Sequence, residues 1–313
     1  MSGLRSFFLV GPTAVGKSAI GHRIAQLEDL DILSADSMLV YKGLDIGTAK
    51  PTQEQRSAVR YWGMDLTTHS QPFSVAAYRR YAISALKIIR EQNRTAVVIG
   101  GTGLYIKSLT HGIGESSPPN PEVRSRLLAC LREGGTQVLQ DMLKRDNTKL
   151  YDNLPDKSNP RRVIRALERT YAKQPNPVRD WQDIGHGPCI VGLSMSGDQL
   201  RKRILNRVEV MYNSGLIAEV RGLLSRGLES APTALQAIGY QEAIDFIKGK
   251  CSQEDAIIRT ATRTSQLAKK QFTWFRNQAN VNLINIDIDD KIDTIIDTIK
   301  TAWQQHGPTP ISE

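Results

Sequence analysis

The chain has 313 residues, enough for one large domain or two modest ones. Its hydrophobic content of 40% and mean hydropathy of −0.33 are those of an ordinary globular protein, and no apolar stretch approaches the length of a membrane span. Lys and Arg number 41 against 32 Asp and Glu, which leaves a net charge of +9. A surplus of this size fits a polyanionic partner as well as plain solubility, so the positions of the charges must decide.

The cysteine pattern excludes a disulfide framework and a zinc site. Cys130, Cys189 and Cys251 are odd in number, far apart and without CxxC spacing. The short apolar run at the N-terminus ends in a glycine-rich loop instead of a small-residue cleavage site, which argues against a signal peptide. We therefore expect a cytoplasmic protein.

Strand and helix patterns alternate over the first hundred residues. Apolar or β-branched runs at 7–10, 31–33 and 95–99 predict buried strands. Helical periodicity at 17–26 and 75–90 predicts helices between them. This alternation predicts an α/β fold with a doubly wound parallel sheet flanked by helices.

The pattern changes after His111. Residues 112–122 are rich in Gly, Ser and Pro and predict a linker; 121–172 read as wholly helical, and 173–188 are again rich in helix breakers. Strands are expected at 189–193 and 281–286, and the tail after Trp303 is expected to fray. We therefore predict three parts: 1–115 as the first part of an α/β core, 116–188 as an inserted all-helical subdomain, and 189–313 as the continuation of the core with basic C-terminal helices.

A phosphate-binding motif follows the first predicted strand and opens the first predicted helix, which is the context that a P-loop requires. Its glycines let backbone N–H groups surround an anion, Lys17 adds a positive charge, and Ser18 can ligate a magnesium ion that bridges phosphate oxygens. A P-loop core predicts a sheet like that of the P-loop NTPases, but the motif does not name the phosphate compound. The motif GPTAVGKS comprises Gly11, Pro12, Thr13, Ala14, Val15, Gly16, Lys17 and Ser18.

Two further stretches lie where parallel strands are expected to end, at the edge where such sheets bind ligands. The segment 34–51, SADSMLVYKGLDIGTAKP, carries Asp36, which read alone could simply be a turn-forming residue. The segment 100–105, GGTGLY, carries Thr102, which could simply cap a helix. The strand at 95–99 ends in GGTG without an acidic residue, which argues against ordinary phosphoryl transfer.

Together these segments resemble the tRNA dimethylallyltransferases, also called tRNA isopentenyltransferases, of bacterial type. The resemblance runs in order from about residue 6 to residue 276, and only local segments depart from it: 60–62, where the family usually carries a His-His pair, and 172–188. The remaining matching strings are PEVRSR at 121–126, PRRVIRALE at 160–168, MYNSGLIAEVRGL at 211–223, AIGYQE at 237–242 and TRTSQLAKKQFTWFR at 262–276.

The resemblance implies transfer of a dimethylallyl group from dimethylallyl diphosphate to the exocyclic amine of the adenosine 3′ of the anticodon, with release of pyrophosphate. The P-loop would then hold the pyrophosphate with Mg²⁺. The family also implies a monomer whose partner is the anticodon stem-loop of tRNA. The target adenosine would have to leave its stack to reach such a site.

The resemblance also implies roles for particular residues. Asp36 would orient the amine and take its proton, and Lys17 would stabilise the departing pyrophosphate. Thr102 would lie near the reacting centre, and Arg124 would line the same channel. Family positions that contact tRNA match Asp36, Ser37, Met38, Leu39, Thr102, Arg124, Arg161, Arg162, Val163, Ile164 and Arg165.

A predicted helix at 256–276 contains basic residues and no acidic ones, which favours phosphate contact over a merely solvated face. Its packed face is expected to include Ile258, Ala261, Ser265, Ala268, Phe272 and Phe275. The residues expected to bind tRNA there are Arg259, Arg263 and Lys270.

Three alternatives remain open from the residues alone. An adenylate isopentenyltransferase would use the same chemistry on free AMP or ADP, and the basic helix argues against it. A P-loop small-molecule kinase would use the arginines at 161–169 as a lid, and the GGTG strand end argues against it. A non-catalytic RNA-binding P-loop protein would have no need of Asp36, Lys17 and Ser18 together.

Overall fold

The computed structural model describes residues 3–113, 120–172, 187–231 and 233–313. The chain divides into two compact units, Met1–Gly112 with Gln182–Glu313 and Ile113–Trp181. The stretches expected to be linkers, 112–122 and 173–188, lie largely outside the described residues, and so does most of the segment 172–188 that departs from the family pattern.

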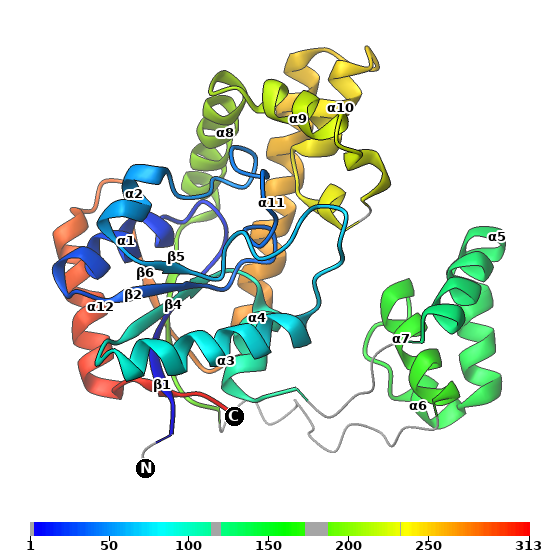
Figure 1. The fold of residues 1–313 in the computed structure, drawn as a ribbon, viewed down its shortest axis with the longest axis horizontal. Coiled ribbons are helices and arrows are strands. Elements are labelled where there is room, and N and C mark those ends of the chain that lie inside the picture. The colour runs from blue at the N-terminus through cyan, green and yellow to red at the C-terminus, as the bar shows by residue number, and fades with distance from the viewer. Residues whose placement is uncertain (1–2, 114–119, 173–186, 232) are drawn as a thin grey trace. The chain divides into compact units, whose positions relative to one another are not determined.

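A seven-stranded sheet forms the centre of the first unit, as far as its residues are described. Six strands are parallel, in the order β3-β2-β4-β1-β5-β6, and β7 pairs antiparallel with β1. Figure 1 shows the sheet between layers of helices. The strands are β1 Arg5–Val10, β2 Asp31–Ser34, β3 Tyr61–Trp62, β4 Ala96–Gly100, β5 Ile190–Ser194, β6 Val281–Asn285 and β7 Thr309–Pro310.

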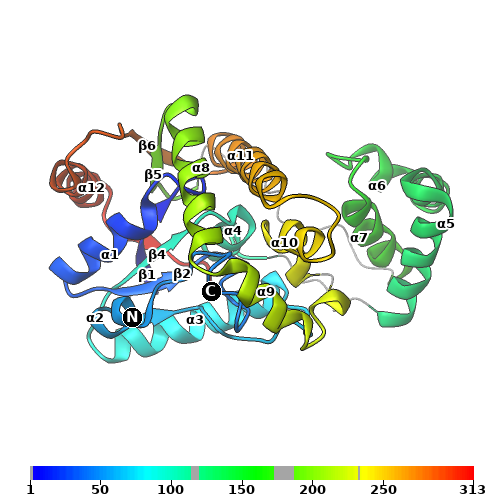
Figure 2. The same cartoon turned by 90° about the horizontal axis from the view of Figure 1, so that it is seen from above.

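In the first part of the first unit, helices alternate with strands along the chain. After β5, most of the chain is helical. Figures 1 and 2 both show α8 and α11 packed side by side. These helices are α1 Lys17–Leu27, α2 Gln53–Ala58, α3 Val75–Glu91, α4 Gly103–Thr110, α8 Gly197–Asn213, α9 Leu216–Leu224, α10 Tyr240–Ile247, α11 Gln253–Gln278 and α12 Ile292–His306, with short 3-10 turns at Leu228–Ser230 and Ala234–Gln236.

Both faces of the sheet are buried, because successive side chains along each strand point to opposite sides. Phe8, Leu33 and Val98 join a core cluster with residues of α3 and α4. Leu9 and Val97 join a second cluster with residues of α1 and α12 on the other face. Two covered faces leave only the ends of the strands open to a ligand.

The described residues of the second unit form helices joined by turns. It contains α5 Pro121–Asp146, α6 Thr148–Asp152 and α7 Pro160–Tyr171. Leu127, Leu139 and Leu167 are fully buried in its own core. Gly135 interrupts α5 with φ of 69°, a left-handed backbone conformation that glycine adopts without a Cβ clash.

The α/β fold with a parallel sheet is confirmed, but two details of the chain differ from prediction. The short strand β3 was not expected. The predicted fraying after Trp303 is wrong: α12 continues to His306, β7 pairs with Arg5 and Ser6, and Ile311 is buried. The physical reason is that the start of β1 offers unpaired backbone groups, which the tail satisfies.

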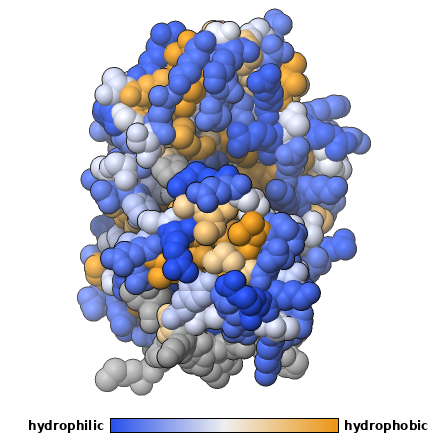
Figure 3. Space-filling model, turned by 90° about the vertical axis from the view of Figure 1, so that its right-hand side faces the viewer, coloured by the Kyte–Doolittle hydropathy of each residue, from blue (hydrophilic) through white to orange (hydrophobic). Residues whose placement is uncertain are grey.

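The surface on the face drawn in Figure 3 is mostly hydrophilic, with small groups of apolar side chains between the polar ones. Among the described residues, none of the helices combines the length and the apolar character that crossing a membrane requires.

Candidate functional site

The P-loop forms the turn between β1 and α1. Gly11 and Gly16 have φ values of 149° and 109°, and a Cβ on Gly11 would lie 2.6 Å from the backbone oxygen of Leu193. Ala14 also has positive φ, at 64°, where a residue with a Cβ is strained. This strained loop leads directly into the N-terminus of α1, the position where backbone N–H groups attract an anion.

Lys17 is buried behind the loop, where its ammonium donates a hydrogen bond to the backbone oxygen of Pro12 at 3.0 Å. Burial lowers the pKa of Lys17 from 10.5 to about 8. The negative charge of Asp36 opposes this shift, and the positive charge of Arg207 adds to it. A buried cation that already contacts a carbonyl group can exchange that contact for a phosphate oxygen.

Arg207, on α8, was not identified from the sequence. Burial lowers its pKa as well, again opposed by Asp36. One turn earlier, the guanidinium of Arg203 lies 3.2 Å from the point where a Cβ on Gly16 would be. The available signal was the four-residue spacing in RILNRV, which puts both arginines on one side of a helix beside Ile204 and Val208. The two cations and Lys17 together outnumber Asp36 and suit an anionic ligand.

Asp36 and Thr102 follow β2 and β4, which are neighbours in the sheet. The Asp36 carboxylate accepts the N–H of Met38 at 2.9 Å. The Thr102 hydroxyl accepts the N–H of Ser37 at 3.0 Å, and the Thr102 N–H donates to the backbone oxygen of Ala35 at 3.2 Å. The two loops are therefore held together by direct hydrogen bonds.

Gln271 on α11 joins the P-loop to the loop after β4. Its Oε1 accepts the N–H of Thr13 at 2.8 Å, and its Nε2 donates to the backbone oxygen of Gly101 at 3.0 Å. This glutamine was also missed from the sequence, because its role depends on where a helix far along the chain packs.

A cavity of about 390 Å³ lies among these groups, wholly within the first unit. The predicted residues Thr13, Asp36, Ser37, Met38, Thr102 and Lys270 line it, together with Arg207 and Gln271. Leu39 lies nearby, partly buried and outside the lining. Lys17 lies behind the P-loop, and Ser18 is exposed in the first turn of α1.

The basic residues of α11 divide into two groups. Arg259 and Lys270 are exposed, and Lys270 reaches the cavity. Arg263 instead forms an ion pair with the buried Glu242 of α10. Ile258 is 60% exposed, so its predicted place on the packed face is wrong. The buried positions include Ala256 and Thr260, which lie two residues before and after Ile258. The reason is that α11 packs against both α8 and α10, and periodicity alone does not show which face these helices cover.

The remaining predicted contacts belong to the second unit. Arg161 and Arg162 are exposed, whereas Arg124 and Arg165 both pair with the buried carboxylate of Glu168. Val163 and Ile164 are buried in the core of this unit, at 0% and 4% exposure. Their side chains pack inwards, as helical periodicity beside exposed arginines requires, so their contact with tRNA stays a prediction that only their backbone can meet.

Comparisons with known proteins place the chain beside one family. The family model "IPP transferase" matches residues 39–278. A tRNA dimethylallyltransferase of Acetivibrio thermocellus is 35% identical over 93% of this chain and 95% of its own length. One from Geobacillus thermodenitrificans is 36% identical and covers 93% of each protein. The solved tRNA isopentenylpyrophosphate transferase of Bacillus halodurans is 34% identical, with a TM-score of 0.69 over 97% of this chain and 98% of that one.

The pKa of Lys17 predicts how pyrophosphate binding depends on pH. Inorganic pyrophosphate should bind roughly tenfold more weakly at pH 9 than at pH 7, because the buried ammonium loses its charge as the pH rises through about 8. Titration calorimetry across this range measures the effect. A Lys17→Arg variant keeps its charge throughout and reports the ligand's own titration. The same pH dependence in both proteins would contradict the assignment.

Proposed function

The chain belongs to the IPP transferase family, and we propose that it transfers a dimethylallyl group from dimethylallyl diphosphate to the exocyclic amine of the adenosine 3′ of the anticodon in tRNA, releasing pyrophosphate. One observation carries this proposal. One cavity lies beside a P-loop with a buried lysine, Lys17, and a half-buried arginine, Arg207, and is lined by a carboxylate on the neighbouring loop. In such a cavity, the leaving group can lie on one side of the reacting carbon, and the amine with the carboxylate that takes its proton can lie on the other side.

The diphosphate end of the site consists of the P-loop, Lys17 and Arg207. Negative charge develops on the pyrophosphate as the allylic carbon–oxygen bond breaks, and fixed cations and N–H groups stabilise that charge. Gln271 holds the Thr13 N–H in place at this end. Lys17 exchanges its bond to Pro12 for a phosphate oxygen when the donor binds.

Magnesium fits this end of the site through Ser18. Mg²⁺ in proteins usually takes one or two protein oxygens and completes its shell with phosphate oxygens and water. The exposed hydroxyl of Ser18 in the first turn of α1 is such a ligand, and among the described residues no group of three acidic, His or Cys side chains is placed to hold a metal ion. When bound, the ion would neutralise charge on the diphosphate.

Asp36 is the base of the reaction. The adenine amine is a weak nucleophile, since its lone pair is delocalised into the ring, and a carboxylate that accepts its hydrogen bond orients it and removes the proton after the new carbon–nitrogen bond forms. One oxygen of Asp36 is used by the Met38 N–H, which holds the carboxylate in place. Thr102 positions Ser37 and thereby the segment that carries Asp36.

Contacts with tRNA come from both units. Ser37, Met38 and Leu39 contact the extruded nucleotide, and Lys270 and Arg259 lie on α11 where phosphates approach. In the second unit, the surface that we assign to the anticodon stem-loop carries Arg124, Arg161, Arg162 and Arg165. We further propose that the protein acts in the cytoplasm as a monomer.

Mass analysis tests the reaction and separates it from the alternatives. The protein is incubated with magnesium, dimethylallyl diphosphate and an anticodon stem-loop RNA, beside samples that contain AMP or ATP. We expect one five-carbon unit on the RNA alone. Prenylated AMP with unmodified RNA would indicate a free-nucleotide prenyltransferase, and phosphate lost from ATP without prenylation would indicate a kinase.

Replacement of Asp36 by Asn should abolish catalysis without abolishing RNA binding. The amide keeps an acceptor for the Met38 N–H but is not a base, so transfer should slow by about 10²- to 10⁴-fold. Single-turnover transfer and filter binding of the stem-loop measure the two effects separately. If Asp36→Asn binds RNA weakly but transfers normally to bound RNA, Asp36 is not the base of the reaction.

Replacement of Arg259 by Ala should weaken RNA binding and make it less dependent on salt. Loss of one phosphate contact should reduce the slope of log affinity against log salt by about 0.7 to 0.9. Arg263→Ala should also weaken binding, but it leaves the buried Glu242 unpaired and should lower the melting temperature as well. Lys300→Ala, which removes an ion pair with Glu28 at the C-cap of α1, is the control. If the slope of log affinity against log salt is unchanged in Arg259→Ala, Arg259 does not contact an RNA phosphate and that side of α11 only faces solvent.

A further inference from the structure

We infer that Glu219 and Tyr240 hold the turn at residues 45–48 as a rigid wall of the cavity, and that this wall restricts the donor to a five-carbon chain. The inference rests on the proposed function, since it concerns the donor of the same reaction. It assigns Glu219 as a positioning residue, which acts through the backbone of the turn.

Helix α8 runs from the P-loop along the cavity, and its residues give the direction from the phosphate site towards this wall. Arg203 lies against the P-loop, and Arg207 interacts with Lys17 and Asp36 one turn further on. Val208 and Met211 follow in the cavity lining. At 1.5 Å per residue, Met211 lies about 12 Å along the helix from Arg203. A donor whose diphosphate occupies the P-loop therefore directs its hydrocarbon chain along α8 towards Met211.

The cavity lining contains a set of apolar side chains besides its polar ones. Met211, Ala237 and Ile238 belong to this set, and Gly47 and Thr48 join the lining from the segment that follows Asp36. The Thr48 hydroxyl does not offer a free polar group, because it donates to the backbone oxygen of Leu44 at 2.6 Å. The apolar part of the lining suits a hydrocarbon chain.

Gly47 fits its position because the Tyr240 ring lies directly behind it. A Cβ on Gly47 would lie 2.5 Å from the Tyr240 ring and 3.0 Å from the Leu216 side chain. Tyr240 itself is fully buried at 0% exposure. The turn therefore cannot move outwards without displacing a buried aromatic ring.

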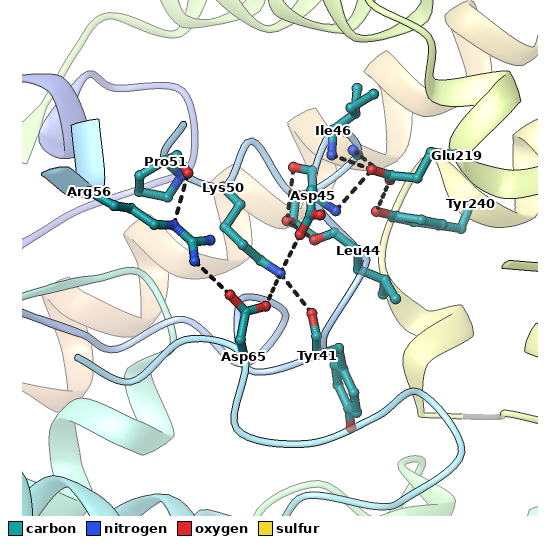
Figure 4. Close-up of polar contacts among 12 residues, drawn as sticks. Tyr41, Leu44, Asp45, Ile46, Lys50, Pro51, Arg56, Asp65, Glu219 and Tyr240 are labelled. Atoms are coloured by element: carbon teal, nitrogen blue, oxygen red, sulfur yellow. Dashed lines mark hydrogen bonds and ion pairs between the residues drawn. The ribbon is translucent and has the colours of Figure 1, made fainter. Parts of the chain in front are cut away.

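Glu219 fixes the turn through its backbone (Figure 4). Its carboxylate accepts the N–H groups of Asp45 at 3.1 Å, Ile46 at 2.7 Å and Gly47 at 3.4 Å. It also accepts the Tyr240 hydroxyl at 2.6 Å. Burial and the nearby Glu219 charge raise the pKa of Tyr240 far above its usual range, so the phenol remains a donor. Four donors on one carboxylate hold the turn and the ring together.

Lys50 secures the other side of the same turn. Its buried ammonium contacts the Asp45 carboxylate at 2.6 Å, the Asp65 carboxylate at 2.7 Å and the backbone oxygen of Tyr41 at 2.7 Å. Asp45 is thus held by its side chain on one side and by its N–H on the other. A chain longer than five carbons would require this doubly anchored turn to move.

The test compares dimethylallyl diphosphate with geranyl diphosphate, which has ten carbons, as donors to the stem-loop RNA. In Glu219→Gln, the amide NH₂ group opposes the N–H donors of the turn. We expect the ratio of kcat/KM for the five-carbon donor to that for the ten-carbon donor to fall at least about tenfold. The inhibition constant of inorganic pyrophosphate should stay within about twofold, because the P-loop end is untouched.

Two further variants make the outcome decisive. Tyr240→Phe keeps the ring behind Gly47 and removes only one donor, so the ratio should fall in the same direction by a smaller factor. Glu209→Gln, on the exposed side of α8, should leave the ratio unchanged. If Glu219→Gln does not fold, Tyr240→Phe decides by itself.

An unchanged donor ratio would overturn the inference, including the case in which both donors become slower in parallel, because that result describes only a structural role. Failure of the proposed function would look different. The unmodified protein would then transfer neither chain to RNA, whereas failure of this inference leaves normal five-carbon transfer.

Discussion

The site depends on the close approach of two neighbouring parallel strands at their carboxyl ends. A Cβ on Gly100 would lie 2.2 Å from the backbone oxygen of Ala35, so only glycine allows β4 to approach the end of β2 this closely. The same oxygen accepts the Thr102 N–H. Because β1 pairs with β4 on its other side, the P-loop opens at the same edge. Phosphate cradle, carboxylate and threonine therefore meet at one place.

Charge at this edge is arranged for a ligand more than for stability. Lys17 is buried and Arg207 is half-buried, both have lowered pKa values, and Asp36 compensates only part of their charge. Buried cations without full compensation cost folding free energy, which an anionic ligand restores on binding. The cluster therefore couples donor binding to the stability of the whole first unit.

Helix α11 lines the cavity and also reaches the solvent-exposed surface. Gln271 joins the P-loop to the loop after β4, and Thr260, Lys270 and Trp274 lie in the cavity lining. Arg259, about three turns before the lining lysine and glutamine, is exposed on the same helix. One helix thus connects the cavity lining with an exposed basic residue.

The sequence alone determined the chemistry at its motifs. GPTAVGKS following an apolar strand, Asp36 and Thr102 at strand ends, and the alternation of strands and helices are local patterns, and local patterns suffice to predict a P-loop fold and its phosphate end. Only the tertiary structure decided which distant residues join them. Arg207, Gln271, Glu219 and Tyr240 come from helices far along the chain, and their roles depend on packing directions that no local pattern encodes. The same reason explains the errors. Ile258 was placed on the packed face without knowing which face of the helix is covered, and the tail was expected to fray because its partner, β1, lies about 300 residues earlier in the chain.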